Sequence, residues 1–130
     1  MYMFDTNIID YLIRGSSPAL KNRFERENPD DFAVSAVVYA EILCGLRKIH
    51  GDKIAAKIRA FLENMRIVDF NDDAADMYAK IGAELEKSGT PIDNMDLLIA
   101  ASAMAEGAVL VSHNTRHFSK IKDLQVEDWY

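Results

Sequence analysis

Cysteine is nearly absent from this chain of 130 residues, in which Cys44 is the only one. A single cysteine cannot form a disulfide within the chain, and it cannot build a cysteine-rich metal site. Proteins of reducing compartments rarely carry disulfides, so this composition leads us to expect a cytoplasmic protein.

Long hydrophobic runs are missing as well. No apolar stretch approaches the roughly 20 residues that a membrane-spanning helix requires. The first residues also lack the basic region and apolar core of a secretory signal peptide. We therefore expect neither a membrane anchor nor a secretion signal.

Positive charge is in deficit, because 15 lysine and arginine residues face 21 acidic ones, for a net charge of −6. Nucleic-acid-binding domains usually carry a basic excess. Two interpretations follow. Either nucleic acid is not the ligand, or part of the acidic charge is gathered where metal ions neutralise it.

The remaining composition is that of an ordinary folded domain, with 49% hydrophobic and 28% charged residues. We expect one domain over residues 1–130. Short apolar runs alternate with amphipathic segments, which predicts an α/β fold of three layers, α/β/α, with a mainly parallel sheet. The predicted strands are residues 2–4, 32–34, 66–70, 108–112 and 125–127. A first short helix is predicted after Asn7. Further helices are predicted over residues 18–28, 36–49 and 94–107, the last of them with a buried stripe on one side. Two more helices are predicted to begin after a turn at residues 51–52 and at an N-cap at Asp72.

The first strand ends in the polar residues Asp5, Thr6 and Asn7. Ligands of open α/β sheets bind in the crevice at the carboxyl ends of the strands, where Asp5 is expected to lie. Asp5 or Thr6 could instead serve simply as the N-cap of the next helix. The first strand by itself does not distinguish these two roles.

Glu41 and Asp96 have no cation placed to pair with them on their own helices. The residues three and four positions from Glu41 are Val37, Val38, Cys44 and Gly45. A glutamate in such surroundings is costly unless it meets a cation, a metal or a donor from another segment, or lies at a tolerated boundary.

Asp96 has another acid, Asp93, among its helical neighbours and no base. Capping explains Asp93 well, because the helix dipole favours an acid in the first turn. It explains Asp96 less well, since Asp96 adjoins the apolar pair Leu97 and Leu98.

A polar segment of residues 112–118 follows the most apolar predicted strand. It contains Ser112, His113, Asn114 and His117. The two histidines can be ordinary surface residues, and Asn114 can cap a short turn.

Three acids without local partners, together with an amide, thus come from four separate segments. Oxygen ligands of this kind suit Mg²⁺ or Mn²⁺ rather than zinc. Converging carboxylates repel one another unless a cation lies between them, and a bound metal can also activate water beside a phosphoryl group.

These residues resemble the motifs of PIN-domain ribonucleases, specifically VapC-type toxins of toxin–antitoxin pairs. The resemblance covers essentially the whole chain. It is carried by Met3-Phe4-Asp5-Thr6-Asn7, by Tyr39-Ala40-Glu41-Ile42 with Gly45, by residues 91–101 (PIDNMDLLIAA), by residues 110–118 (LVSHNTRHF) and by Val126-Glu127-Asp128-Trp129.

The resemblance implies a parallel five-stranded sheet and a magnesium-dependent endoribonuclease that cleaves structured RNA such as tRNA. It further implies a homodimer and a cognate VapB-type antitoxin. Asp5, Glu41 and Asp96 match the family's catalytic acids, with Asp5 and Asp96 as metal ligands for Mg²⁺, or Mn²⁺ as a substitute. Thr6, Asn7, Ser112 and Asn114 are expected to support them. Asn114 and His117 stand where the family often has a fourth acid, which leaves the number of metal ions open.

RNA would have to be held by local cations, and four lie near the expected rim of the site: Arg14, Lys48, Arg116 and Lys120.

Two rival functions remain. A phosphatase with Asp5 as nucleophile would need a second acid two residues later, where this chain has Asn7, and a lysine after a late strand, where it has Ser112 and His113. A binding module without activity would not need all three acids.

Overall fold

The computed structural model describes residues 1–49 and 53–130. In these residues five strands form one sheet, in the order β3-β2-β1-β4-β5, and every neighbouring pair is parallel. The α/β prediction is therefore confirmed, and the sheet is wholly rather than mainly parallel. The strands are β1 (Tyr2–Phe4), β2 (Phe32–Ser35), β3 (Arg66–Val68), β4 (Val109–Val111) and β5 (Val126–Glu127).

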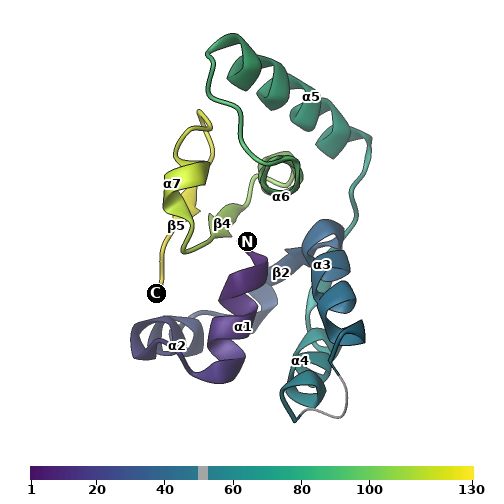
Figure 1. The fold of residues 1–130 in the computed structure, drawn as a ribbon. Helices are drawn as coiled ribbons and strands as arrows, with labels where there is room; N and C mark the ends of the chain where they lie inside the picture. Colours follow the sequence, from purple (N-terminus) through teal and green to yellow (C-terminus); the bar gives the residue numbers. More distant parts are fainter. Residues whose placement is uncertain (50–52) are drawn as a thin grey trace.

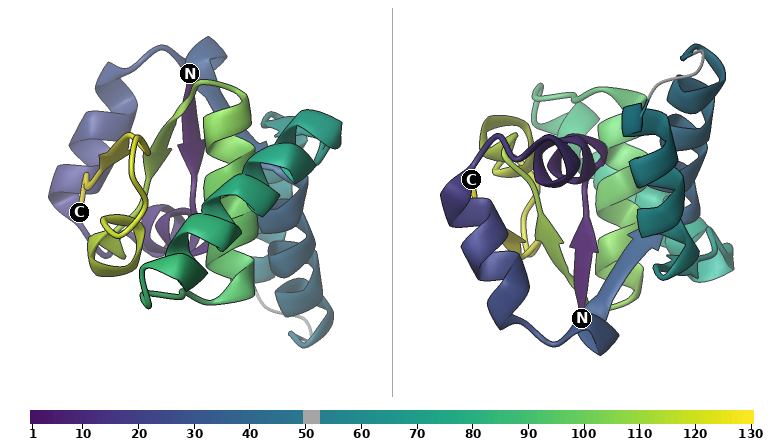
Figure 2. Two further views of the ribbon diagram at one scale, coloured as in Figure 1. Left: turned by 90° about the horizontal axis from the view of Figure 1, so that it is seen from above. Right: turned by 90° about the horizontal axis from the view of Figure 1, so that it is seen from below.

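Helices cover both faces of this sheet, as Figures 1 and 2 show. Helix α6 lies on one face with α5 outside it, whereas α1 and α2 lie on the opposite side, with α3 and α4 next to α1. The helices are α1 (Thr6–Arg14), α2 (Pro18–Arg26), α3 (Ala36–Arg47), α4 (Lys53–Glu63), α5 (Asp72–Lys87), α6 (Asn94–Ala105) and α7 (Thr115–Phe118), with a 3₁₀ turn, η1 (Pro29–Asp31), before β2.

The central strands are short and apolar because helices cover both of their faces. All four residues of β2 are buried, and Met3 and Phe4 of β1 are almost completely buried. Aromatic rings extend this core towards the end of the chain. The buried Trp129 lies 5.6 Å from Phe4, measured between ring centroids, and this contact fixes the segment after β5 against the first strand.

Several boundaries differ from the predicted ones. Strand β3 ends at Val68, two residues early, and α2, α3 and α6 end two residues before their predicted ends. The predicted turn at residues 51–52 lies outside the described residues.

The predicted cap at Asp72 is wrong. The cap is Asn71, whose side chain accepts a hydrogen bond from the amide of Ala74 at 3.0 Å. Asp72 is instead the first helical residue, where the helix dipole favours its charge.

Helix α6 is also buried more completely than a one-sided stripe predicts. Its residues from Leu97 to Ala103 are buried except for Leu98, which is half-buried. The physical reason is that α6 lies between the sheet and α5 and therefore contacts protein on two sides. Gly82 of α5 allows this close packing, because a Cβ at that position would lie 3.3 Å from Leu97.

Candidate active site

Asp5 lies at the carboxyl edge of the sheet, in the short step from β1 to α1. Its backbone amide continues the sheet by donating to the carbonyl of Val111 in β4 at 3.0 Å. Its side chain caps α1 by accepting from the amide of Thr6 at 2.8 Å. The expected position of Asp5 at the strand end and its expected capping role are therefore confirmed, whereas its role in binding a ligand stays a prediction.

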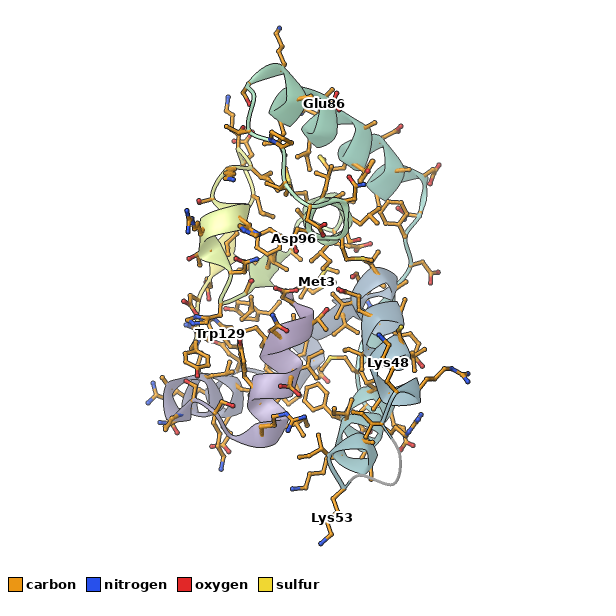
Figure 3. All side chains as sticks on the ribbon, viewed as in Figure 1. Met3, Lys48, Lys53, Glu86, Asp96 and Trp129 are labelled. Carbon is orange, nitrogen blue, oxygen red and sulfur yellow. The ribbon has the colours of Figure 1, made fainter. Side chains whose placement is uncertain are left out.

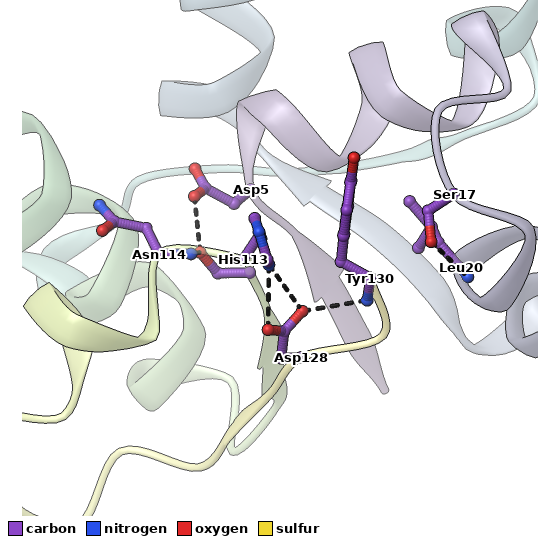
Figure 4. A network of polar contacts seen from close by, with 8 residues as sticks. Asp5, Ser17, Leu20, His113, Asn114, Asp128 and Tyr130 are labelled. Atoms are coloured by element: carbon purple, nitrogen blue, oxygen red, sulfur yellow. Dashed lines mark hydrogen bonds and ion pairs between the residues drawn. The ribbon is translucent and has the colours of Figure 1, made fainter.

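The Asp5 carboxylate is buried, with 7% of the residue exposed. Its second oxygen accepts a 2.8 Å hydrogen bond from the hydroxyl of Ser112, which is fully buried just after β4 (Figure 4). Two strand ends that are 107 positions apart in sequence are thus joined at one carboxylate.

Burial raises the pKa of the Asp5 carboxyl above its ordinary value of 3.8. The hydrogen bonds from Ser112 and from the Thr6 amide act in the opposite direction, because they stabilise the ionised form. The negative charge of Asp96 raises this pKa further. Asp5 and Asp96 are therefore close enough to repel each other.

Glu41 is connected to Asp5 through Thr6. The Thr6 hydroxyl donates to the Glu41 carboxylate at 2.7 Å, while the Thr6 amide donates to Asp5. This contact explains how a glutamate with no cation on its own helix is accommodated on α3. Glu41 also lies on the wall of an apolar groove of about 730 Å³, which α3 forms with Phe70, Met95 and Leu98.

Asp96 lies in the first turn of α6, which Asp93 caps by accepting from the amide of Met95 at 3.0 Å. The capping role expected for Asp93 is confirmed. Asp96 projects from α6 towards the middle of the molecule (Figure 3). One of its oxygens lies 3.1 Å from Nδ1 of His117.

His117 was open to two interpretations in the sequence, as an ordinary surface residue and as the residue at the position of the family's fourth acid, and the structure places it beside Asp96. Its Nδ1 lies near both Asp96 and the side-chain nitrogen of Asn114, the latter at 3.0 Å. A single ring nitrogen cannot donate and accept at once, so only one of these contacts is a hydrogen bond in a given tautomer. The signal in the sequence was weak: His117 stands one helical turn after Asn114, at the edge where the predicted acids gather.

The expected supporting residues divide into two groups. Thr6 and Ser112 hold the acids directly, and the backbone amide of Asn114 donates to the Ser112 hydroxyl at 3.0 Å. Asn114 precedes α7 without a capping hydrogen bond from its side chain. Asn7 is exposed, and its side chain makes no hydrogen bond to residues 1–49 or 53–130.

No three acidic, histidine or cysteine side chains lie at metal-ligand spacing within residues 1–49 and 53–130. The assignment of Asp5, Glu41 and Asp96 as one metal-dependent site therefore stays a prediction. Two carboxylates that repel each other nevertheless suit Mg²⁺, which usually retains several waters and binds through one or two carboxylates. Burial is the main cause of the raised pKa of Asp5, and a bound cation would offset the additional repulsion from the charge of Asp96.

Comparison with known proteins places this geometry in a family. The PIN domain family matches residues 2–124. The chain is 36% identical over 131 residues to "Ribonuclease VapC2" of Rickettsia felis, with 99% of this chain and 98% of that protein covered. The chain belongs to the VapC ribonucleases of the PIN-domain family.

Further VapC proteins extend the match. The "tRNA(fMet)-specific endonuclease VapC" of Shigella flexneri is 31% identical over 129 residues, covering 98% of this chain and 97% of that one. The crystal structure of VapBC2 from Rickettsia felis bound to a DNA fragment from their promoter contains a similar chain. That chain has a TM-score of 0.88 and 35% identity, with coverage of 99% of this chain and 98% of its own. The PIN-domain resemblance inferred from the motifs is thereby confirmed.

Proposed function

We propose that this PIN domain is a magnesium-dependent endoribonuclease toxin that hydrolyses phosphodiester bonds in structured RNA, with tRNA as its substrate. The observation that carries the proposal is Asp5, a buried carboxylate at the carboxyl edge of the sheet that meets the charge of Asp96 and connects to Glu41 through Thr6. Its VapC relatives named as ribonucleases, one of them for tRNA(fMet), support the choice of RNA.

Asp5 and Asp96 are the proposed ligands of Mg²⁺, for which Mn²⁺ can substitute. Such an ion, when bound, supplies positive charge that polarises a phosphodiester and lowers the pKa of a coordinated water. Ser112 and the Thr6 amide orient Asp5 through hydrogen bonds to both of its oxygens. Glu41 is held by Thr6 and acts as the proton acceptor or as the group that orients water.

Four cations around the site are proposed to contact RNA phosphates. Arg14 pairs with Asp10 on α1, Lys48 follows α3 beside the groove of Glu41, and Arg116 and Lys120 are exposed on and after α7. Because this set is small in an acidic chain, the affinity for RNA should fall with salt along a shallow slope.

The proposed partners are a VapB-type antitoxin and a second copy of this chain. The antitoxin is supported by solved VapBC complexes of similar chains, such as the one from Rickettsia felis. No helix in residues 1–49 and 53–130 is long and apolar enough to cross a membrane.

The decisive experiment incubates purified protein with total tRNA in Mg²⁺ or in EDTA. Cleavage should require Mg²⁺ and should disappear in Asp5→Asn, which preserves the size and capping ability of the side chain. Asp76→Asn, an exposed acid on α5, is the matched control and should cleave normally. Cleavage that persists in Asp5→Asn would overturn the assignment, and release of phosphate from small phosphoesters would favour a phosphatase.

A further inference from the structure

Three aromatic rings gather near the candidate site, two from the segments after β4 and β5 and one from α1. The rings of His113 and Tyr130 are stacked, with centroids 4.2 Å apart and planes 24° apart. The Tyr11 ring of α1 meets the edge of this pair, 5.0 Å from Tyr130 and 6.2 Å from His113. We call these residues, Tyr11, His113 and Tyr130, the aromatic platform.

One carboxylate, that of Asp128, contacts both the ring of His113 and the backbone of Tyr130. Its oxygens lie 3.0 and 3.2 Å from Nδ1 of His113. It also accepts a 3.0 Å hydrogen bond from the backbone amide of Tyr130 (Figure 4). The neighbouring Trp129 is buried and its indole nitrogen donates to Glu127 at 2.6 Å, so the backbone that carries Asp128 and Tyr130 is anchored on both sides.

The platform is exposed even though it is held in place. The His113 side chain is 46% exposed and Tyr130 is 44% exposed, the latter being among the most exposed large apolar side chains of the described residues. Stacking occupies one face of each ring and leaves outer surface available. Rings that are already ordered lose little conformational freedom when a ligand stacks on them.

The platform also adjoins the proposed cleavage site along the chain. His113 follows Ser112, whose hydroxyl donates to Asp5. In the view of Figure 4 the His113 ring lies between the Asp5 carboxylate and Tyr130. A nucleic acid with a phosphate near Asp5 would therefore bring a neighbouring base to these rings.

We propose that the aromatic platform binds an unpaired base of the RNA substrate, next to the cleaved phosphodiester, by stacking. The proposal rests on the nuclease function proposed above. Single-stranded bases in RNA loops are commonly held on histidine and tyrosine rings, and such stacking tolerates different bases. Stacking would supply affinity for RNA that this acidic chain, with few cations near the site, cannot obtain from phosphate contacts.

The test begins by mapping the bond that the unaltered protein cleaves in tRNA. A short single-stranded RNA across that bond then carries 2-aminopurine, a base whose fluorescence falls on stacking, at each flanking position. Binding is measured with full-length Asp5→Asn protein, which should hold the RNA without cutting it. A second RNA is abasic at the position whose fluorescence is quenched.

His113→Ala and Tyr130→Ala, each added to Asp5→Asn, should weaken binding of the base-bearing RNA about tenfold and relieve the quenching. Tyr130→Phe retains the ring and should bind within about twofold of the unaltered site. Tyr78→Ala, a half-buried tyrosine on α5, is the matched control and should leave binding unchanged. The abasic RNA should bind weakly and should lose nothing further in Tyr130→Ala.

Asp128→Asn keeps the size of the side chain but weakens its contacts with the His113 ring and the Tyr130 backbone, so it should give a smaller loss of binding. Thermal melting of every variant separates loss of fold from loss of binding. Equal affinity in all variants, or equal losses with the abasic RNA, would overturn the platform while leaving the nuclease proposal intact. Absence of any RNA cleavage by the unaltered protein would refute both proposals.

Discussion

The hydrogen bond between Ser112 and Asp5 gives the most specific prediction about the candidate site. Ser112→Ala removes a buried donor 2.8 Å from the Asp5 carboxylate and also removes the acceptor of the Asn114 amide. The pKa of Asp5 should then rise further, because the Ser112 hydroxyl is a contact that lowers it. The protein should become less stable at neutral pH, where Asp5 is ionised.

The magnitude follows from the charge on the acceptor. A hydrogen bond to an ionised group contributes about 1.5–3 kcal/mol, whereas a bond between neutral groups contributes about 0.5–1.5 kcal/mol. Ser112→Ala should therefore lower the free energy of unfolding by about 2–3 kcal/mol in the unaltered protein. It should cost only about 1 kcal/mol in Asp5→Asn, where the pair is neutral.

The measurement is a double-mutant cycle of urea unfolding at pH 7 without divalent ions. It compares the unaltered protein, both single variants and the double variant. The two substitutions should couple by roughly 1–2 kcal/mol. Strictly additive effects would show that Ser112 does not stabilise the ionised form of Asp5, and the site geometry would then need revision.

Three further predictions concern other residues of the same candidate site, or Asp5 itself. Asp5→Asn should raise the thermal midpoint of unfolding at pH 7 in EDTA, because burial and the Asp96 charge raise the pKa of Asp5 and make its ionised form costly in the folded state. This gain in thermal midpoint should vanish as the pH falls through the raised pKa to 3.8. A constant gain at every pH would contradict the prediction. Thr6→Val should slow RNA cleavage about tenfold, equivalent to about 1.4 kcal/mol in activation free energy, because Glu41 loses its hydrogen-bond donor at 2.7 Å. Thr6→Ser keeps the hydroxyl and should retain activity. Equal cleavage rates for both variants would show that the hydroxyl is dispensable. Glu41→Gln and Asp96→Asn should each relieve growth arrest when the protein is expressed without a partner, and toxicity that continues at equal protein level would remove these residues from the site.

The alternation of strands and helices, and the acid at the end of β1, could be predicted because they depend on local chemistry. A short apolar run that ends in a capping residue determines both the strand and the start of the helix. The same logic failed at Asp72, because Asn71 and Asp72 are both good caps and only the backbone geometry selects between them. The burial of α6 on two sides depends on α5, which no pattern within α6 reveals.

The contacts within the candidate site could be predicted only in part. The sequence singled out Asp5 by its position at a strand end, and Glu41 and Asp96 by the absence of a cation on their own helices, but it could not show which donors meet them. Thr6 and Glu41 are 35 positions apart, and Asp96 and His117 are 21 positions apart. Such pairs arise from the order of the strands in the sheet, so they appear only when the segments are assembled.

The aromatic platform could not be predicted from the sequence. Tyr11 belongs to α1, while His113 and Tyr130 follow different strands, and each is ordinary in its own segment. They come together because β4 and β5 are neighbours in the sheet and because Trp129 anchors the chain beyond β5.

The central claim is that the carboxylates of Asp5 and Asp96 share one divalent ion within reach of Glu41. Crystals soaked in Mn²⁺, measured at a wavelength where manganese scatters anomalously, test this claim most directly. We predict an anomalous peak at coordination distance from both aspartates that is lost in Asp5→Asn crystals. Manganese bound elsewhere, or a peak that remains in Asp5→Asn, would contradict the account.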